Sequence, residues 1–113
     1  MSLLDTFVRR TRFLGEQDGA EERKLKAALM PLFPNLGVNR AYLVRLKYGL
    51  FSSGVALCLQ TMQGAAPEER IVQEIDSVFS RVFPGHLDIM FLNDSRERDV
   101  AAVCPPFFVL QRS

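Results

Sequence analysis

The stretch that decides the fold is residues 55–92, VALCLQTMQGAAPEERIVQEIDSVFSRVFPGHLDIMFL. It begins and ends with mostly apolar runs of strand length, Val55–Gln60 and Leu87–Leu92. Between them, apolar residues recur at helical spacing from Ile71 to Phe83, after a proline and two glutamates that favour a first helical turn. A strand, a helix and a strand in succession predict a right-handed parallel crossover.

The segments on either side of this stretch extend the predicted sheet. Tyr42–Lys47 alternates as a strand does, and a loop rich in glycine and serine joins it to Val55–Gln60, which predicts an antiparallel hairpin. A later polar run offers a helix cap at Asp94 or Ser95 and predicts a short helix. Phe107–Leu110 follows two prolines and is either a docked edge strand or a buried tail.

Two helices are expected before the hairpin. Apolar residues at helical spacing predict one over Ser2–Leu14, and Asp18 with Glu21 resembles the capping box of a second that ends near Met30. The expected fold is therefore a two-layer α+β domain with a mixed sheet of three to four strands. The helix Ile71–Phe83 packs across this sheet, and the N-terminal helices cover the remaining apolar surface or dock onto a second subunit.

The chain has 113 residues, a net charge of +1 and two cysteines. Its length suits a single domain over 1–113, with a helical extension over 1–24 and a body over 25–110. The small net charge argues against nucleic acid and anionic membranes as partners, because both attract clustered excess Lys and Arg. The N-terminus lacks a secretory pattern, no run of about 18 apolar residues occurs, and the cysteines show no CxxC spacing. We therefore expect a cytoplasmic protein with reduced thiols.

Four short motifs occur in an order that resembles a known family. They are Ala41-Tyr42-Leu43-Val44, Gly54-Val55-Ala56-Leu57, Pro84-Gly85-His86-Leu87-Asp88-Ile89 and Pro106-Phe107-Phe108. Together they resemble the C-terminal domain of the SseB family, the bacterial enhanced serine sensitivity proteins, over about residues 25–110. The resemblance implies a helix, a hairpin, a helix and a further strand, and it implies no reaction and no catalytic residue. Phe108 stands where the family often has Tyr, and the family's N-terminal domain has no counterpart in this chain.

Candidate catalytic chemistry is confined to four residues. Cys58 and Cys104 would supply a thiol, His86 a base and Asp88 an acid, but they show no known catalytic spacing. His86 is the only histidine, which excludes a multi-histidine metal site within one chain, and its position is typical of an exposed loop. The cysteines are typical of small apolar core residues. We therefore assign no catalytic, cofactor-binding or metal-binding residue, and expect no cofactor.

Asp88 lies in a predicted strand and shares a sheet face with Met90. If helices cover that face, its carboxylate needs a partner, because an unpaired buried charge is costly. We expect instead a solvated position or an ion pair with Arg45 or Lys47 on the hairpin.

Several large apolar residues fall outside the predicted core positions. They are Phe13, Leu50 and Phe51 at the hairpin tip, and Phe107 and Phe108 in the tail. If they cluster on the folded surface, they form a binding face for a protein partner or a second copy. The alternative is that the N-terminal helix or the tail covers them.

These observations favour a non-catalytic, cytoplasmic protein-interaction or regulatory module that acts as a homodimer. Two alternatives stay open. One is a secretion-associated chaperone or immunity-like protein that binds a single partner, and the other is a small enzyme that uses Cys58 or Cys104 with His86 and Asp88.

Overall fold

The computed structural model describes residues 11–49, 52–85 and 87–111. In chain order, its elements are β1 (Thr11–Glu16), α2 (Ala20–Leu29), the 3-10 helix η1 (Met30–Leu32), α3 (Phe33–Leu36), β2 (Val38–Tyr48), β3 (Ser52–Thr61), α4 (Glu68–Val82), β4 (Asp88–Phe91), α5 (Asp94–Ala101) and β5 (Phe108–Val109). No helix in this part of the chain has both the length and the apolar character needed to cross a membrane.

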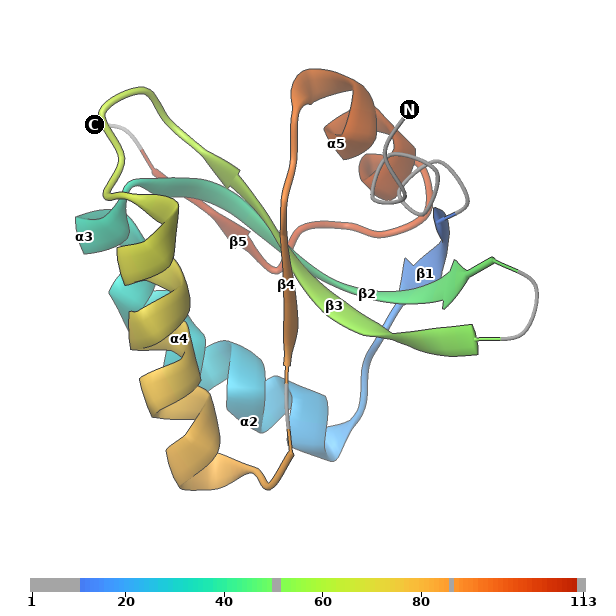
Figure 1. Ribbon diagram of the computed structural model, residues 1–113, viewed down its shortest axis with the longest axis horizontal. Helices are drawn as coiled ribbons and strands as arrows, with labels where there is room; N and C mark the ends of the chain where they lie inside the picture. The colour runs from blue at the N-terminus through green and yellow to red at the C-terminus, as the bar shows by residue number, and fades with distance from the viewer. Residues whose placement is uncertain (1–10, 50–51, 86, 112–113) are drawn as a thin grey trace.

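A mixed sheet with the strand order β1-β2-β3-β4 forms the centre of the molecule (Figure 1). β2 pairs antiparallel with β3, which confirms the predicted hairpin. β1 and β5 both pair with the other edge of β2, β1 near its C-terminal end and β5 near its N-terminal end. β4 joins β3 in parallel after α4. The predicted α+β class, the mixed sheet and the parallel crossover are confirmed.

One face of the sheet packs against α2 and α4. Leu43 and Leu57 point from the strands into this core, where they lie with Leu29 of α2 and with Ile71 and Ile75 of α4, all of them buried. Strand residues alternate between faces, so this set comes from every second position of β2 and β3. The helix pair and the sheet are the two layers that the sequence predicts.

The opposite face of the sheet carries a smaller core beneath α5. Tyr42 and Val44 of β2 and Cys58 of β3 lie there with Val100 of α5, and all four are buried. The strands are therefore apolar on both faces, although α5 is short. Its N-cap is Asn93, whose Oδ1 accepts a hydrogen bond of 2.8 Å from the amide of Arg96. The short helix is confirmed, with its cap one residue before the predicted position.

Helix α4 forms because its apolar residues recur at helical spacing and its ends are well marked. Pro67 precedes it, and Glu68 and Glu69 favour the positive end of the helix dipole. It ends at Val82, and Phe83 is already extended. The predicted helix is confirmed, with a start three residues before Ile71.

The helix predicted over Ser2–Leu14 is wrong in the part that the structure describes. Residues 11–16 form β1, in which Phe13 pairs with Leu46 of β2. Phe13 is buried whereas Leu14 is 42% exposed, which is the alternation of a strand. Pairing with the open edge of β2 supplies backbone hydrogen bonds that outweigh the local helical spacing. This segment therefore belongs to the sheet and not to a helical extension, and the rest of the predicted helix lies outside the described residues.

A helical path continues beyond the predicted end of α2. α2 ends at Leu29, close to the predicted boundary, but the chain continues through η1 and α3. Pro31 and Pro34 lie in the first turns of these two helices, where the missing amide removes no helical hydrogen bond. Gly37 then ends α3 with a left-handed φ of 78°.

Candidate functional site

The two cysteines lie in the core beneath α5. Both thiols are buried, and Cys104 Sγ donates to the carbonyl oxygen of Leu43 at 3.6 Å. Burial raises the pKa of Cys58 to about 12 and that of Cys104 to about 11. A buried thiol that stays protonated at neutral pH is a poor nucleophile, and the structure agrees with the prediction of apolar core cysteines. His86, the base of the enzyme alternative, lies outside the described residues.

Asp88 is the first residue of β4 and is exposed, as the sequence predicts for a solvated position. Its Oδ2 accepts a hydrogen bond of 3.2 Å from the hydroxyl of Tyr48 on β2. Burial and the neighbouring Asp88 carboxylate raise the pKa of Tyr48 to about 12. The structure thus pairs Asp88 with a tyrosine, and no hydrogen bond between Asp88 and either thiol occurs among the described residues.

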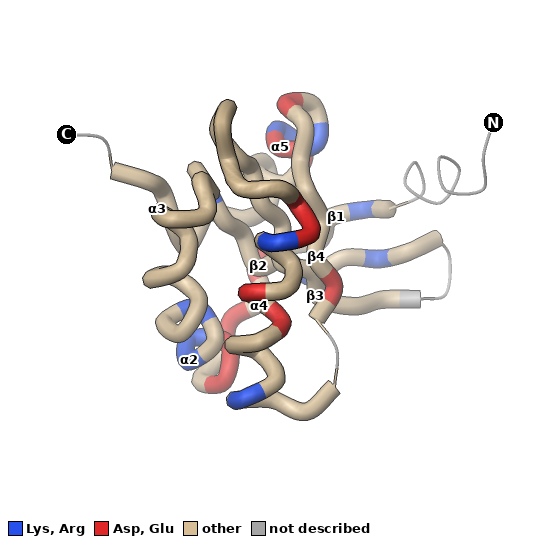
Figure 2. Tube along the Cα trace, turned by 60° about the vertical axis from the view of Figure 1, so that its left-hand side comes forward, with Lys and Arg blue, Asp and Glu red and all other residues tan. Residues whose placement is uncertain are grey.

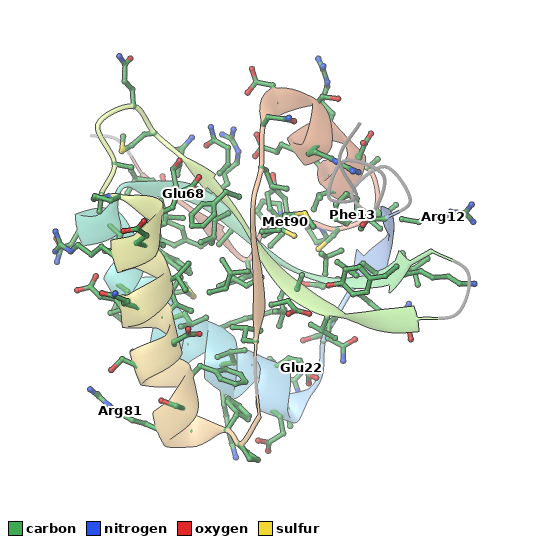
Figure 3. All side chains as sticks on the ribbon, viewed as in Figure 1. Arg12, Phe13, Glu22, Glu68, Arg81 and Met90 are labelled. Carbon is green, nitrogen blue, oxygen red and sulfur yellow. The ribbon has the colours of Figure 1, made fainter. Side chains whose placement is uncertain are left out.

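Of the predicted partner-binding residues, Phe13 is placed in the core. It is only 8% exposed, and the guanidinium carbon of Arg96 lies 5.8 Å from its ring centroid (Figure 3). The prediction that Phe13 lies outside the core is wrong, because β1 turns its side chain toward α5. Leu50 and Phe51 lie outside the described residues.

The tail residues Phe107 and Phe108 are half-buried. Their ring centroids lie 6.0 Å and 5.0 Å from that of Phe33, which belongs to the core beneath α2 and α4. β5 pairs with β2 at Ala41 and holds the tail there. The docked edge strand is therefore the correct alternative, and it covers much of both rings.

A largely buried cluster of hydrogen-bonded side chains, which the sequence does not predict, joins α5 to β2. Glu97 of α5 forms a bidentate pair with Arg40, in which Arg40 Nε bonds to Oε2 and Nη2 bonds to Oε1 at 2.8 Å. The hydroxyl of Tyr42 donates to the same Oε2 at 2.8 Å. These hydrogen bonds and the guanidinium charge lower the pKa of Glu97, whereas burial raises the pKa of Tyr42 to about 12.

The contacts among Arg40, Tyr42 and Glu97 stabilise the fold and do not form a reactive site. Every partner is satisfied, and the pKa shifts keep Glu97 ionised and Tyr42 neutral at neutral pH, so neither exchanges a proton readily. Glu97 is separated from its partners by more than fifty residues in the sequence, so no local pattern could indicate the contact. The described residues contain no group of three or more His, Cys, Asp or Glu side chains arranged for a metal ion.

The candidate interaction site is the outer edge of β4. The amide of Leu92, just after the strand, donates to Leu59 of β3 at 2.8 Å. Backbone groups of successive residues point to opposite sides of a strand, so Met90 and Asp88 also face β3, and Ile89 and Phe91 face outward. Among the described residues, β4 pairs with β3 alone. Two amides and two carbonyls therefore point away from the sheet.

β4 carries few of the features that discourage an edge strand from pairing with another chain. Such features include a short strand, charged side chains, proline and bulges. β4 has four residues and reads Asp-Ile-Met-Phe, with one charge at its first position and no lysine, proline or bulge. A hollow of about 350 Å³ lies along it, with walls that include Val72 and Asp76 of α4 and Met90 of β4. The edge is thus mostly apolar and partly accessible to solvent, with the carboxylates of Asp76 and Asp88 beside it.

Comparison of the chain with models of known protein families, with curated proteins and with solved structures gives no match. The resemblance to the C-terminal domain of the SseB family therefore stays a prediction.

Proposed function

We propose that this chain is a non-catalytic protein-interaction module that forms a homodimer through its β4 strands. The supporting observation is the outer edge of β4, where the backbone groups of Ile89 and Phe91 face outward in a mostly apolar strand that has no lysine, proline or bulge. The buried, protonated thiols of Cys58 and Cys104 fit a role without nucleophilic catalysis.

A second copy fits this edge in one register better than in others. If two β4 strands pair antiparallel about a two-fold axis at Met90, Ile89 of each copy lies opposite Phe91 of the other. In such a pair, the amide of each residue donates to the carbonyl of the other. The two pairs therefore form four hydrogen bonds, which use all the outward-facing amides and carbonyls of Ile89 and Phe91 in both copies. The side chains of Ile89 and Phe91 form cross-strand pairs of a type that stabilises sheets, and the two Asp88 carboxylates lie at opposite ends. The result is one sheet that continues through both copies.

The first test removes an outward-facing amide. Ile89→Pro removes both the isoleucine side chain and the amide hydrogen that faces away from β3. Ile89→Ala removes the isoleucine side chain beyond Cβ but keeps this amide hydrogen. Light scattering should give the mass of two chains for the wild type and for Ile89→Ala, and of one chain for Ile89→Pro. Circular dichroism checks that each variant is folded. A monomeric wild type up to about 100 µM, or a dimeric Ile89→Pro, would overturn the proposal.

A second pair of variants covers the case in which Ile89→Pro does not fold. Met90→Lys places two like charges face to face at the two-fold axis, where pairing distances are shortest. Met30→Lys makes the same change at an exposed position on η1. Met90→Lys is expected to be monomeric and Met30→Lys dimeric, and equal masses for the two variants would contradict pairing through β4.

A further inference from the structure

We propose that a hollow between α2, α4 and the sheet binds a small organic cation with an apolar body, such as an arylalkylamine. The hollow has a volume of about 410 Å³, within the range of small-molecule sites. It lies on the helix-covered face of the sheet and shares only Leu87 and Asp88 with the hollow along the edge of β4. The inference is independent of the proposed dimer.

The hollow exists because the two covering helices diverge. Figure 1 shows the N-terminal end of α2 and the C-terminal end of α4 spreading apart beneath the start of β4. Between them, Leu43 and Val55 form the side of the hollow that belongs to the sheet. Leu25 forms the wall on the α2 side. An apolar body that fills this space would gain contacts that the helices do not supply.

The wall on the α4 side is aromatic. Phe79 and Phe83 are stacked with ring centroids 5.4 Å apart, and both are half-buried. Their ring surfaces suit a flat or aliphatic body of a few carbon atoms. Aromatic faces also attract cations, so the wall tolerates a positively charged group near the rim.

The charges around the hollow favour a positively charged ligand. The charged side chains among the described residues of the lining are all acidic: Glu21 and Glu22 on the first turn of α2, and Asp88 at the start of β4 (Figure 2). A hydrogen bond from Gln17 at 3.0 Å lowers the pKa of Glu22, which is ionised at neutral pH. Glu21 accepts from Lys24 at 3.3 Å in an exposed pair. An ionised carboxylate has about four acceptor positions, so a group that already accepts one or two hydrogen bonds can still bind an ammonium ion.

Two helix ends of opposite sign meet at the hollow, because α2 begins beside Glu21 and Glu22 and α4 ends near Phe83, so the sign of the field comes from the three carboxylates. The last carbonyls of a helix carry a partial negative charge, and α4 ends at the wall formed by Phe83. Arg81 lies on the side of α4 away from Glu22 (Figure 3) and does not line the hollow. An anion would therefore meet repulsion at the rim, whereas a cation meets partners.

The test compares two ligands with the same phenylethyl body, 2-phenylethylamine and 3-phenylpropionate. Titration of the full chain at pH 7, followed by amide chemical shifts, should give saturable shifts around Leu25, Val55 and Phe83 with the amine. The carboxylate ligand should bind about tenfold more weakly. Equal affinity for the two ligands, or shifts spread over other surfaces, would overturn the inference.

Variants then test the two halves of the site. Glu21→Gln and Asp88→Asn should each weaken amine binding about two- to fivefold, as expected for exposed ion pairs. Glu68→Gln, an exposed change at the far end of α4, is the control and should leave the affinity unchanged. Phe83→Leu should weaken both ligands through the lost ring contact. Amine affinity that survives the two carboxylate changes together would contradict the charge argument.

The outcome can be separated from that of the proposed dimer. Glu21 lies on α2, away from the edge of β4. The Glu21→Gln variant should therefore have the same mass as the wild type in light scattering. Weaker amine binding without a change of mass would support the site alone.

Discussion

At the scale of single residues, the polar side chains of this protein serve mainly to hold the fold together. Glu97 is the clearest case, because its two oxygens accept three hydrogen bonds from Arg40 and Tyr42. The Glu97 side chain is 11% exposed and that of Arg40 is 35% exposed, so the pair is shielded on one side and open to water on the other. Such a pair stabilises a protein only while both partners are present.

The loss of the Glu97 charge should therefore cost more than the loss of one of its donors. Glu97→Gln leaves Arg40 without a counter-charge and should lower the free energy of unfolding by about 2 kcal/mol. Tyr42→Phe removes one hydrogen bond and should cost about 1 kcal/mol. Urea unfolding measures both, with Glu74→Gln as control, since its exposed pair with Arg70 at 3.9 Å should contribute about 0.5 kcal/mol or less. Equal losses for Glu97→Gln and Glu74→Gln would contradict a structural role for the buried pair.

At the scale of elements, the connections decide where the helices lie against the sheet. α3 ends at Gly37, whose left-handed backbone turns the chain into β2. A Cβ at this position would lie 2.7 Å from the Cα of Ala65, in the loop between β3 and α4. Gly37 therefore meets two demands, a positive φ and a close backbone approach.

A matched pair of substitutions separates these two demands. Gly64 also has a positive φ, of 83°, but a Cβ there would meet no atom within 4 Å. Gly64→Ala should cost about 1 kcal/mol for the left-handed conformation alone. Gly37→Ala should cost about 3 kcal/mol or more, because the backbone at Ala65 must also move. Thermal unfolding of the two variants measures the difference, and similar losses would show that the close approach is relieved without strain.

At the scale of the whole molecule, ionisable groups limit the pH range in which the fold is stable. The folded state lowers the pKa of Glu97, so its contribution is present above the ordinary value of 4.5 and is lost as the pH falls through the lowered pKa. The folded state raises the pKa of Cys58 from 9.0 to about 12 and that of Tyr42 from 10.0 to about 12. Their contributions are present below the ordinary values and are lost as the pH rises toward 12.

The free energy of unfolding should therefore be highest between about pH 5 and pH 9 and should fall on both sides. Urea unfolding across the pH range checks this, with one variant for each side. Glu97→Gln should show a weaker dependence on acid pH, and Cys58→Ala a weaker dependence on alkaline pH. An acid dependence that is identical in the wild type and in Glu97→Gln would show that other carboxylates dominate.

The whole molecule also shows how far local patterns predict this protein. The amphipathic stripe Ile71–Phe83 and the alternation in Tyr42–Lys47 predict α4 and β2, because each pattern lies within one element. The stripe in Ser2–Leu14 fails over Thr11–Leu14, where the free edge of β2 imposes a strand on residues whose spacing also suits a helix. Phe13 is misplaced for the same reason.

The sequence by itself determined the α+β class, the hairpin, the crossover through α4 and the core character of both cysteines, since these depend on periodicity and composition along short segments. Only the tertiary structure decided that residues 11–16 form a strand and that Glu97 bonds to Arg40 and Tyr42. It also decided which backbone groups of β4 face outward and where the hollow between α2 and α4 lies. Each of these depends on which distant segments become neighbours. Burial, pairing and open edges are properties of that arrangement in space, and no short stretch of the chain contains them.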